Sequence, residues 1–141
     1  MVYIAESAKL TMAYTNVGVS PDGSSTYFLP RLVGHVKAME LIYNNDVLTA
    51  QEAYEWGLVN KVVPDDELMK HVLTVATRLA SGPTLAYGEA KRLIADSLGN
   101  TLETQMELET RAICGLARAS SDTVNAINAF TKKESAEFKG Q

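Results

Sequence analysis

The sequence predicts a mainly α-helical chain with a few short strands, an α/β fold class in which the strands come first. Apolar residues recur at the 3.6-residue helical period along most of the chain after Pro64. Short runs rich in branched and apolar residues, which are typical of strands, precede that proline at 2–5, 9–13 and 58–63. Glycine and proline separate these runs, at the places where helices and strands are expected to end.

The first elements of the chain are two short strands, at 2–5 and 9–13. The second strand places Leu10 and Met12 on one face. A strand needs ladder partners, because unpaired buried backbone groups are costly. We therefore expect residues 2–5 to pair with a distant part of the chain or with another chain.

A turn-rich loop, VGVSPDGSS, follows at 17–25. Glycine frees the backbone, proline fixes φ, and aspartate before glycine favours a turn. Ser24 and Ser25 can cap the next helix. Asp22 is thus a lone carboxylate on a loop at a helix N-terminus, a common location for a functional group. A plain turn or capping role for Asp22 is the alternative.

Two helices are predicted at 25–33 and 35–45, separated by Gly34 as a stop. Thr49 and Glu52 fit a capping box, in which the two residues satisfy the helix-end donors reciprocally. The short helix that they begin ends at Gly57. The strand at 58–63 then ends at Pro64, which cannot continue a ladder.

Four amphipathic helices are predicted after Pro64. They span 65–80, 83–98, 101–119 and a last segment that Ser121 and Asp122 would cap, and a charged, mobile tail follows at 132–141. Pro83 suits the first position of its helix. Their apolar stripes exceed what one small core can bury, which predicts association between subunits, with packing inside one chain as the alternative.

Composition excludes several function classes. The formal net charge is -4, 46% of residues are hydrophobic, and the basic residues form no stripe that would indicate nucleic-acid binding. No apolar run is long enough to span a membrane, and no signal peptide is recognised, so the sequence predicts a cytoplasmic protein. Cys114 is expected to be buried filler, and His35 and His71 to be surface residues without a metal.

Several motifs, in this order and spacing, resemble the crotonase superfamily, also called the enoyl-CoA hydratase/isomerase family. The resemblance covers essentially the whole chain, and the set is specific although no single motif is. The matching segments are AYTNVGVSPDGSSTYFLPRLVG at 13–34, AMEL at 38–41, LTAQEA at 48–53, WGLVNKVVP at 56–64 and SGP at 81–83.

The resemblance implies an architecture of two parts. Residues 1–64 would be the C-terminal part of a spiral of β-β-α turns, and residues 65–141 a helical module of the kind that joins three subunits. Only the C-terminal half of the family pattern is matched, and the first half of the spiral lies upstream of the position matched by Met1. The chain would then be a fragment, a naturally short protein, or the partner of a separate N-terminal half.

The resemblance also implies an acyl-CoA thioester as substrate, with coenzyme A as part of that substrate and no further cofactor. The family's oxyanion donors and the first hydratase glutamate precede Met1. The second hydratase glutamate aligns with Tyr14, which cannot act as a carboxylate base. Asp22 occupies the position of the catalytic aspartate of double-bond isomerases and of the nucleophile of chlorobenzoyl-CoA dehalogenases, and proton transfer is the preferred role.

Substrate-binding roles follow from the same resemblance. Tyr14 would be an aromatic wall of the acyl pocket, with Pro21 and Gly23 beside it in the loop. Phe130 and Lys133 match the closing motif that approaches the CoA nucleotide, although Glu134 and Ala136 replace its arginine and proline. A solvated charged tail is the alternative for that end. For the whole chain, the alternative to an isomerase is a catalytically inactive, oligomerising partner module.

Overall fold

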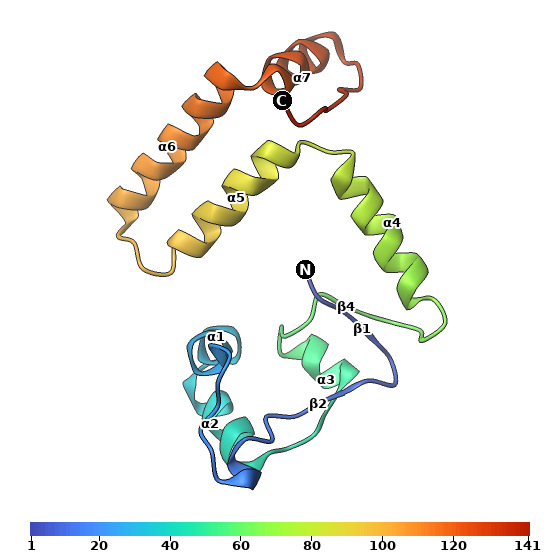
Figure 1. The fold of residues 1–141 in the computed structure, drawn as a ribbon, viewed down its shortest axis with the longest axis vertical. Coiled ribbons are helices and arrows are strands. Elements are labelled where there is room, and N and C mark those ends of the chain that lie inside the picture. The colour runs from blue at the N-terminus through green and yellow to red at the C-terminus, as the bar shows by residue number, and fades with distance from the viewer. The chain divides into compact units, whose positions relative to one another are not determined.

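The computed structural model describes all 141 residues and divides them into two compact units. Unit 1 comprises Met1–Leu73 and unit 2 comprises Thr74–Gln141. The chain is mainly helical with a few short strands, which confirms the predicted fold class (Figure 1). The expected division after residue 64, between a spiral core and a trimerisation module, stays a prediction.

Unit 1 holds two small sheets of two strands each. Strand β1 (Tyr3–Ala5) pairs in parallel with β4 (Lys61–Val63), and β2 (Lys9–Leu10) pairs antiparallel with β3 (Leu48–Thr49). Asn60 extends the first pair, because its side-chain oxygen accepts from the Val2 N–H at 2.6 Å. The expected distant partner of the first strand is thus β4. The three predicted strands are shorter than expected, and β3 was not predicted.

Three helices complete unit 1: α1 (Ser25–Val33), α2 (His35–Asn44) and α3 (Ala50–Glu55). The predicted bounds of α1 are confirmed, and Gly34 separates it from α2 with φ 80°. The predicted capping box is also confirmed, because Thr49 and Glu52 bond reciprocally at the start of α3. The predicted serine cap of α1 is wrong: Ser24 has φ 64° and its side chain makes no capping bond.

The core of unit 1 lies between α1, α2 and the β2–β3 pair. Apolar side chains at helical spacing on α1 and α2 meet there, because both helices turn their apolar faces inward. Leu10 and Met12, which the alternation placed on one face, both pack against this core. Its buried members are Leu29, Ala38, Leu41 and Leu48.

Helix α4 (Leu68–Ala80) begins in unit 1 and ends in unit 2, and it starts three positions later than predicted. We expected His71, on this helix, to be a surface residue, but the structure shows it partly buried. Its ring is half-buried and lies edge-on to Tyr3, with 5.1 Å between the ring centroids. His35 is exposed, in agreement with the prediction.

Unit 2 contains α5 (Thr84–Asp96), α6 (Leu102–Ala119) and α7 (Ser121–Lys132). Helix α6 packs against both α5 and α7. Pro83 is the capping residue of α5 and not its first helical residue. Cys114 on α6 is exposed, so its expected burial is wrong. No helix combines the length and apolar character that crossing a lipid bilayer requires.

The start of α7 differs most from the prediction. Its cap is Ser120, whose hydroxyl oxygen accepts from the Thr123 N–H at 3.3 Å, whereas Ser121 and Asp122 lie inside the helix. The tail returns to this helix start, because the Asp122 carboxylate accepts from the N–H groups of Lys139 and Gly140 at 2.9 and 2.7 Å. Sequence reasoning treated the same tail as mobile.

Candidate functional site

The loop between β2 and α1 is the candidate site, and its shape depends on left-handed residues. A 3₁₀ turn, η1 (Thr15–Val17), ends at Gly18 with φ 76°. Gly23 and Ser24 then have φ 59° and 64°, and they reverse the chain into α1. Glycine adopts this backbone region without strain, which explains the Gly residues at the two bends. The loop therefore brings residue 22 back over residue 14.

The base of this loop is fixed to α2 by Thr15. The Thr15 hydroxyl donates to the Ile42 carbonyl at 2.8 Å and accepts from the Asn45 amide nitrogen at 2.6 Å. Asn45 is itself left-handed with φ 56° and closes α2. The Thr11 hydroxyl donates to the Asn45 carbonyl at 3.2 Å. Two side chains before the bend are thus held by one helix end.

The Asp22 side chain is exposed and has one hydrogen-bond partner, the Tyr14 hydroxyl, which donates to Oδ1 at 2.8 Å. The Asp22 carbonyl is used separately, as the acceptor for the N–H and hydroxyl of Ser25. The bond to Asp22 and the charge of its carboxylate raise the pKa of Tyr14 above its ordinary value. Tyr14 is therefore the donor of the pair, and the carboxylate keeps its second oxygen for other contacts.

Chemically, the Tyr14–Asp22 pair offers an exposed carboxylate with a defined orientation. A carboxylate of this kind can take and return a proton or attack an electrophilic carbon. Pro21 is half-buried beside it and Gly23 supplies the bend, so four of the six predicted site residues lie together in this loop. The chain holds no group of three or more His, Cys, Asp or Glu side chains placed to bind a metal ion.

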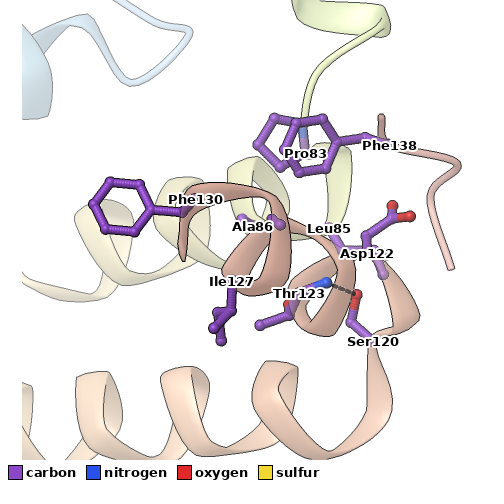
Figure 2. A pocket seen from close by; sticks show the side chains of 10 residues that line it. Pro83, Leu85, Ala86, Ser120, Asp122, Thr123, Ile127, Phe130 and Phe138 are labelled. Atoms are coloured by element: carbon purple, nitrogen blue, oxygen red, sulfur yellow. Dashed lines mark hydrogen bonds between the residues drawn. The ribbon is translucent and has the colours of Figure 1, made fainter. Parts of the chain in front are cut away.

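Phe130 and Lys133, the other two predicted site residues, belong to unit 2. Lys133 ends α7 in the left-handed region with φ 60°. Phe130 is 85% exposed and lines an open hollow of about 420 Å³ between α5, α7 and the tail (Figure 2). Pro83, Ile127 and Phe138 give this hollow apolar walls, and the polar residues Ser120 and Asp122 also line it.

A smaller hollow of about 210 Å³ lies beside the core of unit 1 and is lined mainly by leucine and methionine side chains. Leu10, Leu29 and Leu58 contribute to it, with the Asp46 carboxylate as its only charged group. Asp22 lines neither this hollow nor the larger one.

Sequence reasoning found Asp22 and Tyr14 but not the bond between them. The signal was a turn glycine between the two residues, Gly18, and a second directly after Asp22, Gly23. These glycines permit a chain reversal but do not show which residues it brings together. Thr15 and Asn45 were also missed as the supports of the loop. Their contact joins residues 30 positions apart, and no local pattern predicts a contact over that distance.

The whole chain, residues 1–141, matches the family model described as enoyl-CoA hydratase/isomerase. It is 38% identical over 141 residues to a 1,2-epoxyphenylacetyl-CoA isomerase of Escherichia coli K12, covering 100% of this chain and 53% of that protein. It is 37% identical over 108 residues to 4-chlorobenzoyl coenzyme A dehalogenase-1 of Arthrobacter, covering 77% of this chain and 39% of that protein.

Among solved structures, the fold matches an enoyl-CoA hydratase from Bacillus anthracis with a TM-score of 0.91 and 34% identity. The match covers 99% of this chain and 54% of that one. The chain thus spans about half the length of the relatives it matches, and the expectation that this is their C-terminal half stays a prediction. A family match over the full chain, relatives of this identity and this structural agreement place the chain in the enoyl-CoA hydratase/isomerase family.

Proposed function

We propose that the protein moves a double bond within an acyl-CoA thioester, with Asp22 as the base that transfers the proton. The observation that carries the proposal is the exposed Asp22 carboxylate, held at a tight bend by a single phenol hydroxyl. No hydrogen bond within the chain reaches its Oδ2, so this oxygen is available to a substrate.

The reaction needs one base acting at two carbons. Asp22 removes a proton from the carbon beside the thioester carbonyl, and the electron pair of that C–H bond delocalises into an enolate. The enolate electrons then form a new double bond between the carbon beside the carbonyl and the next carbon, while the former double bond is lost as its far carbon takes up the proton returned by Asp22. Preorganised N–H donors stabilise the developing oxyanion in such reactions. Under this proposal, a part of the spiral outside residues 1–141 supplies those donors, whether in a longer chain or a separate half.

The acyl group that we propose is cyclic or aromatic. Tyr14 would form a wall beside Asp22, and an aromatic ring packs well on a planar acyl group. The similarity to a 1,2-epoxyphenylacetyl-CoA isomerase supports this class of substrate. Pro21 and Gly23 would shape the same wall, and Phe130 and Lys133 would contact the nucleotide end of coenzyme A.

Hydration is the less suitable reaction, because it requires a second carboxylate where the chain has Tyr14. Dehalogenation is a second candidate, supported by the similarity to 4-chlorobenzoyl coenzyme A dehalogenase-1. In that reaction Asp22 would attack the aromatic carbon and chloride would leave, and water would then release the phenol and restore the carboxylate. Release of chloride from 4-chlorobenzoyl-CoA separates this candidate from isomerisation.

A non-catalytic role is the third candidate, in which the protein associates as a trimer, or a multiple of it, and serves as a partner module. It is supported by the large apolar side chains that unit 2 leaves exposed, among them Leu102 at 71% and Ile113 at 68%. In this case acyl-CoA esters would not bind. A bound ester at 100 times its dissociation constant should raise the free energy of unfolding by about 2.7 kcal/mol, which thermal denaturation detects.

The deciding experiment compares the native protein with Asp22→Asn on two probes, straight-chain 3-hexenoyl-CoA and cyclic cyclohexenylacetyl-CoA. We expect conjugated product from the native protein and a loss of turnover in Asp22→Asn at unchanged melting temperature. Exchange of the proton beside the carbonyl with D2O should disappear in the same variant. Full turnover or full exchange in Asp22→Asn would show that another group is the base.

A further inference from the structure

Tyr14 lies on a fixed base, whereas Asp22 lies on an exposed bend. The Tyr14 carbonyl accepts from the N–H groups of Val17 and Val19 at 3.1 and 3.3 Å. The next residue, Thr15, is bonded to the end of α2 through Ile42 and Asn45. The backbone that carries the phenol is therefore tied to the end of α2, while the Asp22 side chain has no hydrogen-bond partner except that phenol.

The bond between them has a directional consequence for the carboxylate. A carboxylate rotates easily about its terminal torsion, and its two oxygens exchange places when nothing holds them. The Tyr14 hydroxyl, 2.8 Å from Oδ1, selects one of these orientations. A base must lie within hydrogen-bond reach, about 2.6–3.2 Å, of the atom that carries its proton, and a misplacement of about 1 Å slows the reaction, so fixing the torsion matters for rate.

We propose that Tyr14 is a positioning residue for Asp22, whose hydroxyl holds Oδ1 and leaves Oδ2 as the oxygen that takes and returns the proton. This inference rests on the proposed function of Asp22 and adds a role that an aromatic wall does not require. Tyr14 transfers no proton itself. Its phenol stays protonated at neutral pH because the ordinary pKa of tyrosine is about 10, and the neighbouring Asp22 carboxylate raises that pKa further.

Two other roles for Tyr14 predict different kinetics. A wall that only contacts the acyl group changes KM when its polar edge is altered, because it binds substrate and transition state alike. A residue that only stabilises the loop lowers the melting temperature. A positioning residue lowers kcat at nearly constant KM, because it acts on the orientation of the base during the reaction.

The test is Tyr14→Phe, which keeps the ring and removes the hydroxyl, with Tyr54→Phe as the matched control. Tyr54 is exposed on α3 and lies outside the loop. On 3-hexenoyl-CoA and cyclohexenylacetyl-CoA we expect Tyr14→Phe to lower kcat about tenfold. We expect KM to change less than about twofold, the melting temperature to stay unchanged, and the control to match the native protein.

A second measurement tests for the hydrogen bond between Tyr14 and Asp22 in the absence of substrate. Phenolate absorbance during a pH titration should contain one tyrosine that ionises later than the others. It should be missing in Tyr14→Phe and should ionise earlier in Asp22→Ala. The absence of any late tyrosine in the native protein would contradict the bond on which the inference stands.

The outcomes separate the two proposals. If Asp22→Asn is inactive while Tyr14→Phe retains full kcat, or changes KM alone, the positioning role is wrong and the proposed function stands. If Asp22→Asn retains full turnover, the proposed function is wrong and the positioning role fails with it. A fall in kcat in both variants, larger for Asp22→Asn, supports both.

Discussion

Asp22 in unit 1 and Asp122 in unit 2 both lie close to the start of a helix, but their carboxylates have opposite surroundings. Asp122 is 5% exposed, and its two oxygens accept from the backbone N–H groups of three consecutive residues, Lys139, Gly140 and Gln141. Asp22 is exposed and accepts from one phenol hydroxyl. A carboxylate whose lone pairs are used by the backbone holds structure together, whereas one with a vacant oxygen is available for chemistry.

The two units also differ in which side chains they bury. Every buried apolar side chain of the protein belongs to unit 1, whereas the two buried residues of unit 2 are the polar Ser120 and Asp122. Unit 2 is therefore closed at one end by hydrogen bonds to its own tail, and its helices keep large apolar side chains exposed. We expect substitutions of the two aspartates to separate cleanly into effects on turnover and effects on stability.

The largest expected effect is on turnover by Asp22→Asn. A general base contributes up to several orders of magnitude, so we expect kcat on the acyl-CoA probes to fall about a thousandfold. The melting temperature should not change, because the side chain is exposed. Steady-state kinetics and calorimetry on the same preparation measure both quantities. If Asp22→Asn lowered the melting temperature instead, Asp22 would have a structural role like that of Asp122, and the proposed difference between the two aspartates would be wrong.

The reverse result is expected for Asp122→Ala. Removing this carboxylate leaves three backbone N–H groups at the tail without their acceptor, and buried polar groups without partners are costly. We expect the melting temperature to fall by roughly 5–10 °C and trypsin to cleave faster after Lys139. Glu109→Ala, on the exposed side of α6, is the matched control. Equal protease resistance in the two variants would mean that Asp122 does not hold the tail.

Stability should also depend on pH through Asp122. The N–H of Lys139, followed by those of Gly140 and Gln141, holds the pKa of this carboxyl below its ordinary value of 3.8. Because the folded pKa is the lower one, the unfolded chain binds the proton first as the pH falls. The stabilisation is complete above the ordinary value and is lost progressively below it, as the pH falls towards the folded pKa. Urea denaturation of native protein and Asp122→Ala between neutral and acidic pH should converge at the acidic end.

The smallest effect concerns the capping box of α3, which touches neither aspartate. Thr49→Ala removes the acceptor for the Glu52 N–H and should cost about 1 kcal/mol of the free energy of unfolding. Thr49→Ser keeps the hydroxyl and should recover most of that loss. Urea denaturation measures the free energy of unfolding of the native protein and both variants. Equal values for the alanine and serine variants would mean that the cap does not stabilise the protein.

Local patterns predicted the helices well because their signals lie within a few residues. The bounds of α1 and the Thr49–Glu52 box follow from spacing and from reciprocal side-chain bonds over three positions. The predictions that failed concern contacts or backbone conformations that the local pattern does not determine. The carboxylate of Asp122 fits a helix cap in sequence, but its partners come from the tail 17 positions later. Ser24 fits a cap too, but the bend at Gly23 turns it into the left-handed region.

The candidate site shows the same limit. Aspartate after proline and before glycine marks a bend, and the resemblance to a known family gave Asp22 a role. The phenol that orients it lies eight positions earlier, and its position depends on the contact of Thr15 with Asn45 across 30 positions. A sequence motif identifies the reactive group, whereas its orientation depends on how distant segments pack.

The parallel pairing of β1 with β4 has a consequence for how the protein folds while the ribosome synthesises it. Val2 and Asn60, which close that pair, are 58 positions apart. The opening strand therefore emerges long before the segment that will cover it, and contacts of such long sequence separation form slowly. We expect unit 1 to stay protease-sensitive during synthesis until Val63 has left the exit tunnel, and then to close in a single step.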